Sequence, residues 1–123
     1  MIKKDDLKDW LAEGDRNKSK EKLEAFIDKR IKYNALSGKT TFTVCTGEYT
    51  RDGSVKTEFY DLWYDQSLSK NNQIIVQNEV IANYQEFGFD VKKVNVDCGW
   101  SNNYPALKFT DIDYLLDESI KDN

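Results

Sequence analysis

Apolar residues recur every three to four positions at the start of the chain, and this spacing predicts two amphipathic helices. The first covers residues 5–13 and ends at Gly14, since glycine is favoured where a helix stops. A polar break over 15–19 separates it from the second helix, which covers 19–36 and ends at Gly38. The apolar positions are Ile2, Leu7, Trp10 and Leu11 in the first stretch, then Leu23, Phe26, Ile27, Ile31 and Ala35 in the second.

The pattern then changes to alternating runs rich in threonine, valine and aromatic residues over 39–64. Asp52 and Gly53 between these runs predict a β-hairpin, because a two-residue type I′ turn needs positive φ at both central positions. This register places Phe42 opposite Trp63. One face carries Phe42, Val44, Val55, Phe59 and Trp63, and the other carries Thr41, Thr43, Cys45, Tyr49, Tyr60, Leu62 and Tyr64.

A third helical pattern over 70–88 is the clearest in the chain. Ser67 or Ser69 is available as its N-cap, and Gly88 is expected to end it. The residues expected to share one face of this helix are Ile74, Gln77, Val80, Ile81, Tyr84 and Phe87.

Two further strands over 89–97 and 104–110 predict a second hairpin, and a last helix is expected over 111–120. The alternation changes phase at Lys92-Lys93, which indicates a bulge or a twist near the end of the strand. Pro105 has no N–H group, so its strand is expected to lie at a sheet edge or to begin there.

These elements predict an α+β fold in a single domain that covers residues 1–123. Their order is ααββαββα, with one four-stranded, largely antiparallel sheet packed with helices. The expected parts are a helical N-terminal part (1–38), a β-hairpin (39–64), a helix (70–88), a second β-hairpin (89–110) and a C-terminal helix (111–120).

The composition restricts the possible chemistry, because the chain has no histidine and only two cysteines. Acid–base relays through histidine and nearly all zinc sites are therefore excluded. Cys45 and Cys98 are expected to be reduced and slow to react. The chain lacks a long apolar run and an apolar signal segment, so we expect a cytoplasmic protein without a membrane partner, a cofactor or a metal.

Charge is distributed unevenly along the chain, whose net charge is −4. Residues 1–40 hold eleven Lys/Arg and eight Asp/Glu, whereas 41–123 hold seven and fourteen. A nucleic-acid-binding hypothesis would use the basic cluster at the start of the second helix as phosphate contacts. That cluster consists of Arg16, Lys18, Lys20 and Lys22. Acids interleaved with it, among them Glu21, Glu24 and Asp28, favour an ordinary solvated helix surface instead.

Acidic and aromatic residues accompany one another in the remainder of the chain, a combination suited to recognising a basic protein surface. The candidate partner-binding residues are Tyr49, Glu58, Tyr60, Tyr64, Asp65, Asp97, Trp100 and Tyr104. Two alternatives remain open: the first two helices could cover the hairpin tyrosines as core, and the turn that holds Trp100 could fold back onto the end of the core.

Other positions are weaker candidates. Asp61 lies between Phe59 and Trp63 on the apolar side of its predicted strand, where burial would raise its pKa. Contact with solvent at a sheet edge, or a lysine partner, is the simpler expectation. Asp5-Asp6 and Asp111-x-Asp113 lack the ligand number of a metal site and suit helix N-termini.

The composition is acidic, rich in lysine, asparagine, isoleucine and tyrosine, and nearly free of proline. It resembles that of small proteins from phages and mobile elements of AT-rich bacteria. This resemblance favours a non-enzymatic protein that binds a basic protein partner, such as an inhibitor, an anti-defence protein or an immunity protein. Nucleic-acid association is the first alternative, and an enzyme that relies on carboxylates is the second. We expect a monomer or a weak dimer.

Overall fold

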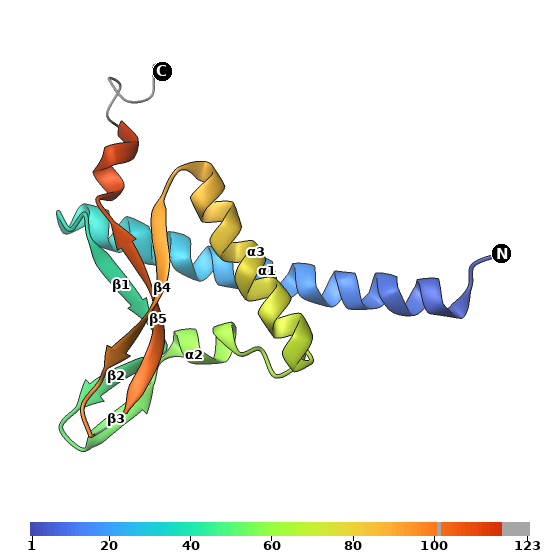
Figure 1. Cartoon of the computed structure of the whole chain (residues 1–123), viewed down its shortest axis with the longest axis horizontal. Coiled ribbons are helices and arrows are strands. Elements are labelled where there is room, and N and C mark those ends of the chain that lie inside the picture. The colour runs from blue at the N-terminus through green and yellow to red at the C-terminus, as the bar shows by residue number, and fades with distance from the viewer. Residues whose placement is uncertain (101, 117–123) are drawn as a thin grey trace.

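A long N-terminal helix, a small antiparallel sheet and two further helices make up most of the structure, a computed structural model that describes residues 1–100 and 102–116. Figure 1 shows the sheet beside the C-terminal half of the long helix, while the N-terminal half projects away from the other elements. The elements are α1 (Lys4–Leu36), β1 (Phe42–Cys45), β2 (Gly47–Thr50), β3 (Gly53–Lys56), α2 (Glu58–Trp63), α3 (Lys70–Phe87), β4 (Asp90–Asp97), β5 (Asn103–Thr110) and the 3₁₀ helix η1 (Ile112–Leu116). The predicted α+β class with antiparallel sheets is confirmed.

The predicted break between two N-terminal helices is wrong, because α1 runs without interruption for 33 residues. Gly14 keeps helical backbone geometry, which costs only about 1 kcal/mol relative to alanine. Contacts with the other elements begin in the polar segment that was expected to be a loop: Arg16 hydrogen-bonds Asn72, and Ser19 is buried. The predicted end is confirmed by Gly38, whose φ is 76°.

The inner face of the sheet and all three α-helices enclose one hydrophobic core. Leu23 and Ile27 of α1 are completely buried, as is Phe109 of the sheet. At about 25 cal/mol per Å² of apolar surface, such residues supply most of the drive to fold. The remaining core residues are Phe42, Val44, Phe59, Trp63, Leu68, Val76, Val80, Tyr84, Val91 and Leu107.

The hairpin predicted over 39–64 is only partly present. Its turn lies one residue earlier than predicted, since Thr50 pairs with Gly53 across Arg51-Asp52. Residues expected to form its second strand instead form α2. Phe59 and Trp63 are four residues apart, a spacing that buries one side of a helix as well as one face of a strand.

β1 pairs with β5 instead of with the residues that follow it in the chain. The result is a three-stranded sheet in the order β1-β5-β4 and a separate two-stranded sheet of β2 and β3, so the predicted single four-stranded sheet is wrong. Pro105 lies in the central strand, but outside the β1 ladder, whose last pair joins Cys45 to Ala106. The missing N–H of Pro105 therefore breaks no pairing with β1.

The β4–β5 pairing is regular from Asp90↔Thr110 to Asp97↔Asn103, so the bulge expected at Lys92-Lys93 is absent from this ladder. The helix α3 begins and ends as predicted, with Ser69 as N-cap and Gly88 after its last residue. After β5 the chain forms η1 in place of the first part of the predicted 111–120 helix, and 117–120 lie outside the described residues.

Candidate functional site

A groove between α1 and α3 combines acidic and aromatic side chains. Its volume is about 450 Å³, and it is lined by residues from α1 and α3 and by the residue just before β4. The lining consists of Glu24, Asp28, Ile31, Asn83, Tyr84, Phe87 and Phe89.

Tyr84 forms the floor of this groove and links the two helices. Its hydroxyl lies 2.5 Å from Oδ1 of Asp28 and 3.0 Å from the carbonyl oxygen of Glu24. Burial, together with the hydrogen bond and negative charge of Asp28, raises the pKa of the Tyr84 hydroxyl above its ordinary value. Tyr84 is therefore a neutral donor at physiological pH and does not cancel the charge of Asp28.

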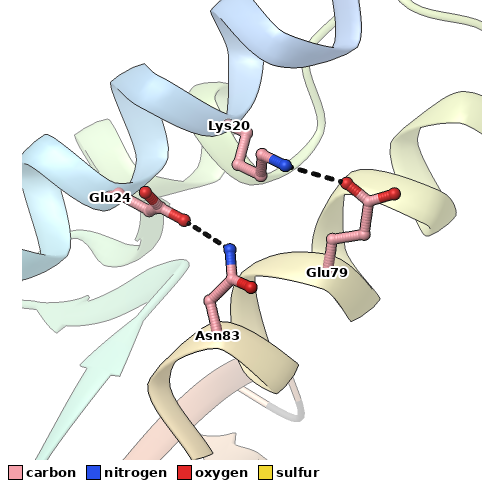
Figure 2. Close-up of polar contacts among 4 residues, drawn as sticks. All are labelled: Lys20, Glu24, Glu79 and Asn83. Carbon is pink, nitrogen blue, oxygen red and sulfur yellow. Dashed lines mark hydrogen bonds and ion pairs between the residues drawn. The ribbon is translucent and has the colours of Figure 1, made fainter. Parts of the chain in front are cut away.

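Polar contacts across the same helix pair are visible in Figure 2. Asn83 Nδ2 donates to Oε1 of Glu24 at 2.9 Å, and Lys20 Nζ lies 3.2 Å from Oε2 of Glu79. The lysine thus neutralises Glu79 on α3, whereas the partner of Glu24 is an uncharged amide.

Glu24 and Asp28 both lie on α1, four residues apart, so their side chains are neighbours on one helix face. Within the described part of the chain, neither carboxylate forms an ion pair; both are held by neutral donors. Two like charges at this spacing destabilise a helix by about 0.2–0.5 kcal/mol. A bound cation would remove this repulsion.

Aromatic surface adjoins these carboxylates. Phe87, at the end of α3, is 74% exposed and stacks on Phe89, with ring centroids 5.5 Å apart. Ile31 of α1 packs against the core beside them. Such a surface can cover the apolar stem of a lysine or arginine side chain while the carboxylates receive its charged end.

The structure divides the eight predicted partner-binding residues into two groups. Tyr49, Asp97, Trp100 and Tyr104 lie in β2 and around the β4–β5 turn, where Tyr49 packs over Gly99. Trp100 is 60% exposed, so it does not plug the core.

The second group, Glu58, Tyr60, Tyr64 and Asp65, lies in α2 and just after it. Tyr60 and Tyr64 contact each other and are half-buried. Burial is the larger cause of the raised pKa of Tyr64, and the charge of Tyr60 is the smaller one. Burial alone would also raise the pKa of Asp65, but hydrogen bonds from Ser67 and Ser19 and the charge of Lys22 outweigh it and lower that pKa.

The four basic residues of the nucleic-acid hypothesis do not share one face. Arg16 bonds Asn72 and Lys20 pairs with Glu79, so both are directed toward α3. Lys18 and Lys22 are exposed elsewhere on the helix. A different basic groove lies between α1 and α2, where Lys22, Lys29 and Arg30 line a volume of about 510 Å³ with Tyr33 and Glu58.

The remaining predicted candidates lie apart from these grooves. Asp61 is exposed on α2, because its segment is helical. Cys98 is buried and Cys45 is half-buried. Burial is the largest cause of the raised pKa of Cys98, and the adjacent Cys45 thiol is the next largest. In the part of the chain that the structure describes, no three acidic or cysteine side chains are arranged to hold a metal ion.

Comparisons of the chain with protein-family models, curated proteins and solved structures gave no match. Of the helices that the structure describes, none combines the length and apolar character needed to cross a membrane.

The α1–α3 groove is not predicted from the sequence. In the sequence pattern, Glu24 and Asp28 fit an ordinary solvated helix surface, and Tyr84 and Phe87 fit one apolar helix face. The available signal was the acidic pair at i,i+4 spacing on α1, combined with an aromatic residue on each side of Gly88. The contact between α1 and α3, which brings these features together, is a tertiary one.

Proposed function

We propose that this chain is a non-enzymatic binding protein, and that its α1–α3 groove receives a lysine or arginine side chain from a basic protein partner. The observation that carries this proposal is the pair Glu24 and Asp28, whose hydrogen-bond partners are neutral. Among the described residues, one oxygen of each carboxylate accepts no hydrogen bond. Charge-assisted bonds to such oxygens are stronger than neutral ones. The acidic excess of residues 41–123 would speed the encounter with a basic surface.

An inhibitor or immunity protein would act in this way, by covering a basic surface that its target needs. The composition favours this class, as described above. Trp100 and Tyr49 lie near the other end of β4 from the groove, so only a partner long enough to span this strand would contact both surfaces.

The test is titration of a fluorescein-labelled eight-residue lysine peptide into the protein, followed by fluorescence polarisation. We expect the double variant Glu24→Gln/Asp28→Asn to bind about tenfold more weakly, because two charge-assisted contacts are removed. Phe87→Ala is expected to weaken binding as well, by removing the apolar wall. Its control is Ile74→Ala, which truncates another exposed side chain of α3.

The matched control for the charges is Asp9→Asn/Asp61→Asn, which changes the net charge equally at exposed positions of α1 and α2 outside both grooves. If both double variants weaken binding to the same extent, the effect is general electrostatics and the groove is not the site. Salt should weaken peptide binding by all variants, since a Debye length of about 10 Å at 0.1 M screens exposed charges.

Nucleic-acid binding is a second candidate because Lys22, Lys29 and Arg30 gather with Tyr33 in the α1–α2 groove. Cationic and aromatic groups together suit single-stranded nucleic acids. A gel shift with a single-stranded oligonucleotide tests it: binding that weakens steeply with salt and is lost in Lys22→Gln/Lys29→Gln would support this candidate. Binding that this variant retains would count against it.

A further inference from the structure

The N-terminal half of α1 carries an apolar stripe that no other element among residues 1–100 and 102–116 covers. Leu7, Trp10 and Leu11 are 49%, 53% and 64% exposed, and this part of α1 projects beyond the other elements (Figure 1). Among the described residues, Arg16 is the first side chain of α1 to hydrogen-bond another element. A contiguous apolar stripe left exposed in this way marks a surface for a covering partner.

The stripe faces away from the body of the molecule. A helix turns by about 100° per residue, so Leu7 is about 160° from the buried Leu23 around the axis, and Gly14 is about 180° from it. The C-terminal half of α1 therefore buries one side of the helix, and the N-terminal half presents the opposite side. While Leu23 and Ile27 remain in the core, the sheet and the other helices cannot move around α1 to cover this stripe.

The stripe has the spacing of a short coiled coil. Leu7 and Gly14 take heptad position a, Trp10 takes d, and Leu11 widens the stripe on the e side. Charges on its two edges differ in sign. The g edge carries Asp6 and Glu13, whereas the e edge carries Lys4 and Lys18, and all four are exposed.

We propose that a second copy of this chain covers the stripe, with the two α1 helices parallel. In a parallel pair, each g residue faces the e residue five positions further along the other helix, so Glu13 lies opposite Lys18 of the second copy. An antiparallel pair would place g beside g and e beside e. In the register that packs Leu7 against Trp10, it brings Asp6 against Glu13 and Lys4 against Leu11, so its contacts between charged residues are repulsive. The charge pattern therefore favours the parallel direction, and the match of Glu13 with Lys18 makes the stripe complementary to a second copy.

The position of the body agrees with this pairing. Because the core-facing side of α1 is opposite the stripe, two parallel helices would hold the two bodies on the outside of the pair, away from each other. The stripe covers only two heptads, fewer than the three to four typical of an independent coiled coil. We therefore expect a weak, reversible dimer whose population rises with concentration.

Sedimentation equilibrium of the full chain between about 10 μM and about 1 mM tests the association, a range that covers weak affinities. The wild type is expected to shift toward dimer as concentration rises, and Trp10→Ala and Leu7→Ala to remain monomeric. The control is Leu36→Ala, a truncation of another exposed leucine on α1 that should leave the shift intact. Circular dichroism at about 10 μM, where the weak dimer is not populated, should show unchanged melting of all three variants, because none of these side chains is in the core.

A charge exchange tests the direction. In a parallel dimer Glu13→Lys and Lys18→Glu each weaken association, and the double variant restores it. In an antiparallel dimer Glu13→Lys would strengthen association, because it relieves repulsion by Asp6; that result would overturn the parallel arrangement. A wild type that stays monomeric up to about 1 mM, or a dimer that Trp10→Ala leaves unchanged, would overturn the proposal itself.

Discussion

Two tyrosine rings lie directly over glycines where the β2–β3 hairpin meets the β4–β5 turn. A Cβ atom on Gly47 would overlap the ring of Tyr104, and a Cβ on Gly99 would overlap the ring of Tyr49. A hydrogen bond from Asn102 Nδ2 to Ser54 Oγ, 2.7 Å long, joins the same two segments. At the scale of single residues, the lack of a side chain at these two glycines therefore allows the two-stranded β2–β3 sheet to pack against the β4–β5 turn.

Gly47→Ala is expected to destabilise the protein by about 1–3 kcal/mol, because the added methyl group must displace Tyr104. The measurement is denaturant unfolding. Gly14→Ala is the matched control: nothing lies within 4 Å of its Cβ position, and alanine is the better helix former. It should raise helicity without lowering stability. A Gly47→Ala variant as stable as wild type would show that the ring does not hold this position.

At the scale of elements, α2 depends on α3 for its place. Gln77 of α3 donates from Nε2 to the carbonyl of Trp63 at 2.9 Å in a buried position, and Gln73 donates to the carbonyl of Asp65 at 2.8 Å. These amides satisfy backbone oxygens at the end of α2 and in the loop that follows. Polar residues on the inner face of α3 thus hold a short helix that has few hydrogen bonds of its own.

Gln77→Leu is expected to cost about 1–3 kcal/mol of stability, because the buried Trp63 carbonyl loses its donor. Gln66→Leu is the matched control, since Gln66 donates to the carbonyl of Tyr64 at an exposed position where water can replace it. Thermal unfolding of both variants distinguishes the two cases. Equal melting temperatures would mean that the buried bond contributes nothing beyond what water supplies.

At the scale of the whole molecule, three groups in different parts of the fold have raised pKa values. Tyr84 joins α1 to α3, Tyr64 follows α2, and Cys98 lies at the end of β4. Burial is the main cause in each case. In the alkaline range the folded state therefore binds more protons than the unfolded state, and stability falls as pH rises.

Below about pH 8, these groups are expected to leave the free energy of unfolding unchanged. The free energy should then fall as pH rises above the pKa values in the unfolded chain, about 8.5 for cysteine and about 10 for tyrosine. Tyr84→Phe should be less stable than wild type at pH 7 by about 1 kcal/mol, because it lacks the bond to Asp28. It should also lose less stability between about pH 9 and pH 11.

Denaturant unfolding at several pH values measures both effects, with Tyr33→Phe on the exposed side of α1 as control. If Tyr84→Phe followed the wild-type pH dependence throughout, Tyr84 would not be one of the groups responsible. Asp65 acts in the opposite direction: its lowered pKa contributes stability near neutral pH that is lost on acidification.

The sequence by itself determined the features that depend on local periodicity and on special backbone positions. The helix α3, a serine cap at 67 or 69 and the glycines after α1 and α3 follow from such signals, as does the β4–β5 hairpin. The structure places the cap at Ser69. The apolar residues of these elements form one clear face, and that face packs against the core. Local preference and tertiary packing therefore agree.

The tertiary structure decided the cases in which local signals fit two outcomes. Phe59 and Trp63 suit a strand or a helix, and only the space beside β1 and α3 selects the helix. The partner of β1 is β5, more than fifty residues away, because Phe42 and Val44 complete the core only beside Phe109 and Leu107. The α1–α3 groove was likewise beyond reach from the sequence, because Glu24, Asp28, Tyr84 and Phe87 form one surface only when the two helices pack together.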